Sequence, residues 1–161
     1  MSVCLELERI ERQQLLTAVF QPLADLRLGN VFGYEGLIRG PQGTPWHNPM
    51  ALFEAAEQCG CFQSLELLCR KVVVQAFVAQ RLPGKLFLNV SPDCLSQPDY
   101  RSGRTLEAIL EAGLDPRRVI IELTEHKPAN DYGLLGEAIA HYRKMGFTVA
   151  IDDLGEGFAS L

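Results

Sequence analysis

Short hydrophobic runs alternate with amphipathic stretches in the second half of the chain. The runs cover 86–90, 119–123 and 147–151, and helices are predicted between them over about 104–112 and 131–145. Strands that alternate with helices are typical of βαβ units, in which a parallel sheet is buried on both faces. The second half of the sequence therefore predicts the α/β class.

The beginning of the chain is less regular. Residues 1–18 mix leucine and isoleucine with many charged residues, which indicates a helical lead-in or the end of a linker. A short extended segment at 20–23 is followed by a turn signal at Gly29-Asn30. Residues 31–39 are rich in strand formers and predict the first long strand.

Two further helices are predicted before the first hydrophobic run. One begins after Asn48, with Pro49 at its first position, and ends at Gly60. The other covers about 64–81. Its predicted apolar face consists of Leu65, Leu68, Val72, Ala76 and Ala79.

Polar side chains recur near the carboxyl ends of the predicted strands. Glu35, Asn89 and Glu122 each lie within one strand, and Asp152-Asp153 follow the last one. Because the carboxyl ends of such strands meet at one edge, these groups are expected to lie close together. Clustered acids repel one another unless a cation binds them, and oxygen ligands favour Mg²⁺, Mn²⁺ or Ca²⁺ over zinc. The alternative is that each residue separately caps its own strand.

Two charged residues lie close to this set along the sequence. Arg39 is four residues after Glu35, where a guanidinium suits a phosphate or carboxylate of a ligand, although a surface salt bridge is the alternative. Glu125 is three residues after Glu122 and is interpreted as organising the loop that follows the strand.

Five segments, in this order, resemble the EAL family of bacterial cyclic di-GMP phosphodiesterases. The segments are FQPL at 20–23, EGLIR at 35–39, LNVSP at 88–92, ELTE at 122–125 and DDLGEGFASL at 152–161. FQPL resembles the opening strand of the family, and EGLIR matches the E-A-L-x-R motif with glycine in place of alanine. The last segment resembles the D-D-F-G-T-G-Y-S-S-L loop. The resemblance implies that 19–161 belong to a TIM-like (β/α)8 barrel that hydrolyses cyclic di-GMP to linear pGpG.

The resemblance also implies roles for individual residues. Gln21 and Leu37 would line the nucleotide pocket, and Arg39 would contact a phosphate. Glu125 would stabilise the loop after Asp153, through which the family communicates with a homodimer partner. The ligands of two Mg²⁺ or Mn²⁺ ions would be Glu35, Asn89, Glu122, Asp152 and Asp153.

The sequence departs from the family pattern in three ways. Gly36 replaces a small residue with a smaller one and is predicted to be harmless. The final loop differs from the family at Leu154, Glu156, Phe158 and Ala159. The family's catalytic lysine, a later glutamate and a late glutamine have no counterpart, because the resemblance places them past Leu161. Beyond the metal ligands, no catalytic residue is therefore expected within these 161 residues.

The length of the chain bears on activity. A complete barrel of this kind needs about 250 residues, and 161 residues hold only about its first half. The chain alone is therefore expected to be inactive, to expose apolar faces, and to aggregate or pair with another chain. The alternative function is a degenerate EAL domain that binds cyclic di-GMP or a protein without turnover.

Composition excludes several other classes of protein. A net charge of −5 gives no basic surface for DNA or RNA, no apolar stretch is long enough for a membrane span, and charges interrupt any signal peptide. The five cysteines include no C-x-x-C pair, which predicts reduced thiols in a cytoplasmic protein. The sequence is compatible with a sensory domain before residue 1.

Overall fold

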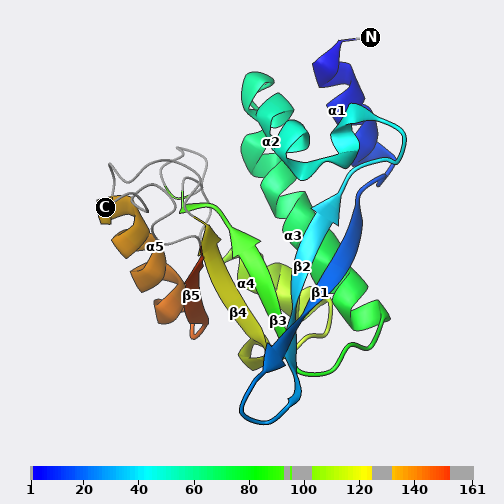
Figure 1. The fold of residues 1–161 in the computed structure, drawn as a ribbon. Coiled ribbons are helices and arrows are strands. Elements are labelled where there is room, and N and C mark those ends of the chain that lie inside the picture. Colours follow the sequence, from blue (N-terminus) through cyan, green and yellow to red (C-terminus); the bar gives the residue numbers. More distant parts are fainter. Residues whose placement is uncertain (1, 93–94, 96–102, 125–131, 153–161) are drawn as a thin grey trace, which may run out of the picture.

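The computed structural model describes residues 2–92, 95, 103–124 and 132–152 (Figure 1). Within them, one sheet has the strand order β1-β2-β3-β4-β5. The strands are β1 (Thr17–Asp25), β2 (Asn30–Arg39), β3 (Lys85–Val90), β4 (Val119–Thr124) and β5 (Thr148–Asp152). The helices are α1 (Val3–Arg12), α2 (Pro49–Gln58), α3 (Phe62–Ala79), α4 (Arg104–Glu111) and α5 (Tyr132–Lys144), with 3-10 turns at Pro45–His47 and Pro116–Arg118. The predicted α/β class is confirmed.

The sheet contains one antiparallel pair and three parallel pairs. β1 pairs with β2 antiparallel, and β2-β3, β3-β4 and β4-β5 are parallel. Only 26–29 connect β1 to β2, which is too short for a crossover, so the chain must turn back directly. Asp25 stabilises this turn, because its side chain accepts hydrogen bonds from the backbone N–H groups of Arg27 and Leu28 at 2.8 and 3.1 Å.

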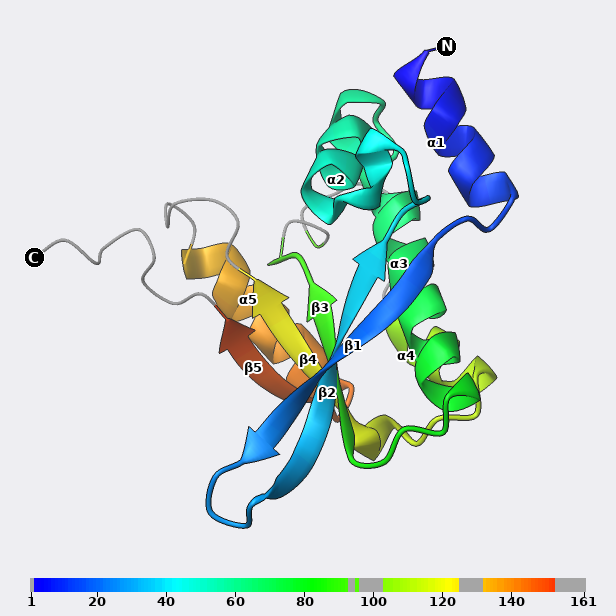
Figure 2. The same ribbon diagram turned by 45° about the vertical axis from the view of Figure 1, so that its right-hand side comes forward.

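α3, α4 and α5 form a layer along the sheet, whereas α1 and α2 lie beyond one end of β1 and β2 (Figure 2). α3 packs against β1, β2 and β3 and contacts α4, and α5 packs against β4 and β5. Alternate strand residues such as Leu86, Leu88 and Ile121 are almost fully buried under these helices. The residues between them therefore lie on the other face of the sheet. None of the described helices is long and apolar enough to cross a membrane.

The predicted apolar face of α3 is partly wrong. Leu65 is fully buried, but Leu68, Val72 and Ala76 are half-buried and Ala79 is exposed. The most deeply buried residues form a stripe rotated around the helix, because α3 contacts α2 and α4 as well as the sheet. This stripe includes two charged residues and consists of Leu65, Glu66, Leu67, Cys69, Arg70, Val73, Val74 and Phe77.

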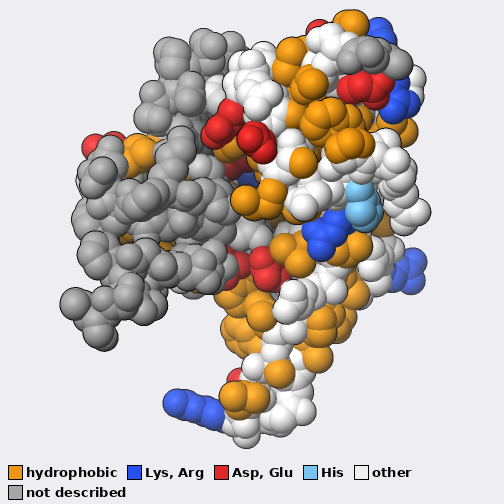
Figure 3. Space-filling model, turned by 45° about the horizontal axis from the view of Figure 1, so that its top comes forward, with side chains coloured by type: hydrophobic (Ala, Val, Ile, Leu, Met, Phe, Trp, Pro, Cys, Tyr) orange, Lys and Arg blue, Asp and Glu red, His pale blue; other side chains and the backbone are white. Residues whose placement is uncertain are grey.

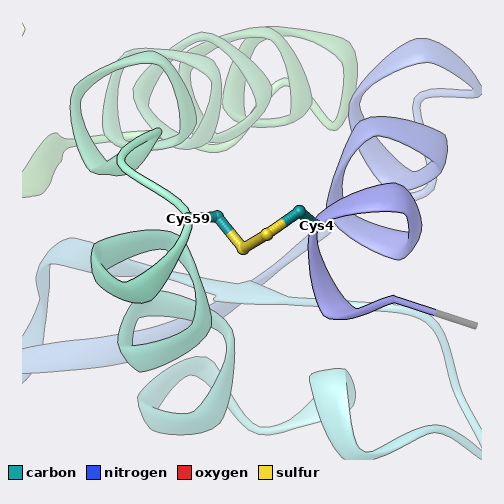
Figure 4. The surroundings of a disulfide bond; sticks show 2 residues. All are labelled: Cys4 and Cys59. Atoms are coloured by element: carbon teal, nitrogen blue, oxygen red, sulfur yellow. A yellow bond between two sulfur atoms is a disulfide. The ribbon is translucent and has the colours of Figure 1, made fainter.

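The prediction that every cysteine is a reduced thiol is wrong. Cys4 of α1 and Cys59 at the end of α2 form a disulfide, with their Cα atoms 5.6 Å apart (Figure 4). α1 packs onto α2, and its Leu7 and Ile10 belong to the core, which brings together two cysteines 55 residues apart. No local sequence pattern reports such a distant pairing. Among the described cysteines outside the disulfide, Cys61 and Cys69 are free.

This disulfide predicts a specific thiol-labelling pattern. When the denatured, non-reduced protein is alkylated, Cys61 and Cys69 should be labelled, whereas Cys4 and Cys59 should be labelled only after reduction. Mass spectrometry of the peptides measures this directly. Labelling of Cys4 before reduction would contradict the pairing, and the Cys59→Ser variant should free Cys4 as a control.

Burial also predicts a pH dependence of stability. Burial, reinforced by the neighbouring Glu66 carboxylate, raises the pKa of Cys69 from 9.0 to about 12. The unfolded chain loses this proton near pH 9.0 while the folded chain retains it, so the free energy of unfolding should fall between pH 9 and about 12. Urea unfolding at several pH values measures the slope. A Cys69→Ala variant with the same alkaline slope would contradict this assignment.

Candidate functional site

The polar residues predicted for the site lie on the face of the sheet opposite the helices. Gly36 faces α3, because a Cβ added there would contact Val73, so Glu35 points to the other face. Gln21 is the cross-strand partner of Glu35, and Asn89 is the partner of Glu122. Four strands thus bring four polar residues onto one face of the sheet, with Asn89 and Glu122 close to the carboxyl ends of β3 and β4 and Glu35 in the middle of β2.

We call these four residues the polar row. Two of its members are in direct contact. The side-chain Nδ2 of Asn89 donates a hydrogen bond of 2.8 Å to Oε1 of Glu35. Both side chains are half-buried. The predicted proximity of Glu35 and Asn89 is therefore present in the structure, 54 residues apart in the chain.

The side-chain carbonyl oxygen of Asn89, Oδ1, indicates whether the row fits a metal ion. Its Oδ1 is buried, and no hydrogen-bond donor among the described residues contacts it. A buried carbonyl oxygen without a donor is costly unless something else binds it. The Glu35 carboxylate and the Glu122 carboxylate are the neighbouring groups in the row. This donor set of two carboxylates and one amide oxygen fits a hard divalent cation such as Mg²⁺, Mn²⁺ or Ca²⁺.

The next strand, β5, continues the row through its backbone. Asp152 is the last residue of β5 and pairs with Thr124, two residues beyond Glu122 on β4. No group of three histidine, cysteine or acidic side chains that fits a metal occurs within the described ranges. Figure 3 looks onto this end of the molecule and shows acidic side chains among hydrophobic ones beside the residues in grey.

Part of the predicted site falls on residues that the structure does not describe. Glu125 and Asp153, both predicted for the site, lie outside the described residues. The same is true of the rest of the final loop as far as Leu161, past which the resemblance places the family's catalytic lysine and later glutamate. The predicted roles of these residues therefore stay predictions.

The predicted nucleotide-binding residues lie beside the row. Leu37 and Arg39 alternate with Gly36 and Ile38 along β2, so they share the face of Glu35. Gln21 is exposed on β1, Leu37 is half-buried, and one Arg39 nitrogen donates 2.7 Å to the backbone carbonyl of Ile38.

Sequence analysis missed a buried charged pair behind the site. Glu66 and Arg70 on α3 are 5% and 6% exposed and form an ion pair of 3.5 Å. The backbone N–H of Ser91, two residues after Asn89, donates 2.7 Å to Oε1 of Glu66. The four-residue spacing of opposite charges on one helix was the available signal, but such pairs are usually exposed.

Known proteins match nearly the whole chain. The sequence model of the EAL domain matches residues 6–161. An uncharacterized signaling protein of Caulobacter vibrioides is 31% identical over 144 residues, covering 88% of this chain and 18% of that protein. The probable cyclic di-GMP phosphodiesterase PdeB of Escherichia coli is 30% identical over 147 residues, covering 88% of this chain and 28% of PdeB.

Solved structures show the same fold. Klebsiella pneumoniae BlrP1, determined as a complex with manganese and cyclic di-GMP, superposes with a TM-score of 0.73 at 26% identity, over 92% of this chain and 37% of BlrP1. Another BlrP1 complex contains calcium and cyclic di-GMP. The chain thus spans less than half of each of these proteins, and its five-stranded sheet is part of a larger TIM-like fold.

Proposed function

Because this chain belongs to the EAL domain family, we propose that it supplies the metal-binding half of a phosphodiesterase site that hydrolyses cyclic di-GMP to linear pGpG. One observation carries this proposal. The Asn89 side chain donates to Glu35 while its buried carbonyl oxygen has no donor among the described residues, and Glu122 is its partner on the next strand. PdeB, a probable cyclic di-GMP phosphodiesterase, and the manganese complex of BlrP1 support the same conclusion.

The proposed cofactor is Mg²⁺ or Mn²⁺, in a two-metal site. Glu35, Asn89 and Glu122 would hold it together with Asp152 and Asp153. When bound, divalent ions provide Lewis acidity toward a phosphodiester and lower the pKa of a bound water. The four carboxylates would offset the positive charge of the cations, and the Asn89–Glu35 hydrogen bond fixes the amide so that its oxygen points away from Glu35.

Neighbouring residues would then orient the nucleotide. Arg39 lies on the face of Glu35, four residues further along β2, where its guanidinium would neutralise a phosphate oxygen. Leu37 lies between them and would form an apolar contact for a base or ribose. Gln21, across from Glu35 on β1, would donate or accept a hydrogen bond at the edge of the pocket.

Further features belong to the same proposal. The domain would span 19–161, Glu125 would stabilise the loop after Asp153, and that loop would contact a homodimer partner. A sensory domain preceding the chain and a cytoplasmic location complete it. Thiol labelling in intact cells tests the location, because disulfides are rare in reducing compartments, and a Cys4–Cys59 disulfide that persists there would contradict it.

The experiment is an assay for pGpG formation by a complete barrel. Residues 1–161 would be joined to the C-terminal half of the PdeB EAL domain and compared with the 161-residue chain and with PdeB itself. The joined protein should convert cyclic di-GMP to pGpG with Mn²⁺ or Mg²⁺ and lose this activity in EDTA, and the chain alone should show none. Binding of cyclic di-GMP without pGpG, even after Mn²⁺ addition, would support the receptor function instead.

A further inference from the structure

The backbone just beyond Asn89 is held by a charged side chain from a different layer. Ser91 is 8% exposed, and its N–H donates 2.7 Å to Oε1 of Glu66 on α3. Ser91 precedes Pro92, so its backbone is restricted to extended conformations. The Glu66 carboxylate thus anchors the chain just after β3 ends, two residues beyond Asn89.

The Glu66 anchor is itself fixed by Arg70. The two side chains form an ion pair of 3.5 Å, and Arg70 Nη1 also donates to the Thr105 hydroxyl of α4 at 2.9 Å and the Tyr142 hydroxyl of α5 at 3.3 Å. Thr105 is 5% exposed and Tyr142 fully buried. Arg70 therefore connects three helices to the carboxylate that holds the end of β3.

A buried ion pair is weak evidence for a role in stability alone. Desolvation of two charges offsets much of their attraction, and apolar pairs of similar volume are often as stable. The Glu66–Arg70 pair adds something an apolar pair lacks, namely an anionic acceptor for a backbone N–H at a defined place. Outer residues that orient metal ligands commonly change metal affinity by about 10–100-fold when replaced.

We propose that Glu66 and Arg70 are positioning residues that set the orientation of Asn89 through the Ser91 peptide. This inference rests on the proposed function for its link to metal binding, but not for its structural part. Glu66 acts on the backbone after Asn89 and not on substrate, so its loss should weaken metal binding and local order while the fold remains.

The test compares three variants of the 161-residue chain. The Glu66→Leu/Arg70→Met double variant removes both charges at similar volume, so no unpaired buried charge remains. Glu66→Gln/Arg70→Met keeps an acceptor for the Ser91 N–H and likewise leaves no buried charge unpaired. Val74→Ala, fully buried on α3 eight residues beyond Glu66, is the matched control for loss of packing. Amide hydrogen exchange at Ser91 without metal, and Mn²⁺ affinity by calorimetry, are the two measurements.

Glu66→Leu/Arg70→Met should show circular dichroism like the original chain. Its Ser91 exchange should be at least about 10-fold faster than in Val74→Ala at matched stability, and its Mn²⁺ affinity about 10-fold weaker. Glu66→Gln/Arg70→Met should retain most of the Ser91 protection and of the Mn²⁺ affinity. Unchanged Ser91 exchange in Glu66→Leu/Arg70→Met would overturn the inference. If the original chain bound no Mn²⁺ while Ser91 exchange still responded, the proposed metal site would fail and the positioning of the strand end would stand.

Discussion

Replacing Glu35 by glutamine is expected to lower the rate of cyclic di-GMP hydrolysis by the complete barrel by about 10³-fold or more. The substitution removes one negative charge at the centre of the row and keeps the shape of the side chain. Glutamine retains an oxygen that accepts the hydrogen bond from Asn89 Nδ2, so the fold should persist. A direct metal ligand should matter more than the outer partners of ligands, whose loss costs about 10–100-fold.

The measurement is kcat/KM for pGpG formation across a Mn²⁺ titration, in the joined protein described above. Glu54→Gln is the matched control, because Glu54 is an exposed acid on α2 that undergoes the same change of charge. Activity of Glu35→Gln equal to that of Glu54→Gln would remove Glu35 from the metal site. Partial rescue at high Mn²⁺ would instead agree with weakened binding of the cation.

The sequence predicted the strand ends well because their chemistry is local. A carboxylate or amide inside a hydrophobic run is unusual, and such groups occur at Glu35, Asn89 and Glu122. The period of the βαβ units predicts that these residues lie at one edge. In the structure these residues share one face and Asn89 contacts Glu35, as the predicted proximity requires, although Glu35 lies in the middle of β2 and not at its end. Periodicity and burial cost were sufficient for this part.

Features that depend on contacts between distant segments were not predictable in this way. Glu66 and Arg70 look like an exposed helical pair, and only the packing of α3, α4 and α5 shows that they are buried. The Cys4–Cys59 disulfide depends on how α1 docks against α2. In both cases the local pattern favoured the commoner state of the residues, and tertiary packing determined the actual one.

The glycine of the EGLIR motif was predicted to be a harmless replacement for alanine, and the structure shows why it is coupled to another residue. A Cβ at Gly36 would lie well inside contact distance of Val73 Cγ1 on α3 and 3.5 Å from Leu86 Cδ1. Valine on a helix is restricted to essentially one rotamer, so its methyl group cannot swing away. Val73 therefore fills the space that the family's alanine methyl would occupy.

Gly36→Ala, which restores the family residue, is accordingly expected to lower the free energy of unfolding by about 3 kcal/mol, the cost of overpacking a dense core. Val73→Ala alone should also destabilise, because it leaves a cavity. In the double variant the new methyl group occupies that cavity. The double variant should therefore lose about 2 kcal/mol less free energy of unfolding than the sum of the two single losses. Urea unfolding followed by circular dichroism measures all four proteins of the cycle.

Gly136→Ala separates overpacking from the general effect of replacing a glycine. Gly136 lies in α5, and a Cβ there would meet nothing within 4 Å, so this substitution should stabilise by about 0.5–1 kcal/mol. If Gly36→Ala lowers the free energy of unfolding and Gly136→Ala raises it, the loss at Gly36 arises from the α3–β2 contact. Additive losses in the Gly36/Val73 cycle would show that the two positions are independent. Coupling would show instead that α3 and the strand carrying Glu35 are packed as one unit, so that a helix residue limits which side chains the motif accepts.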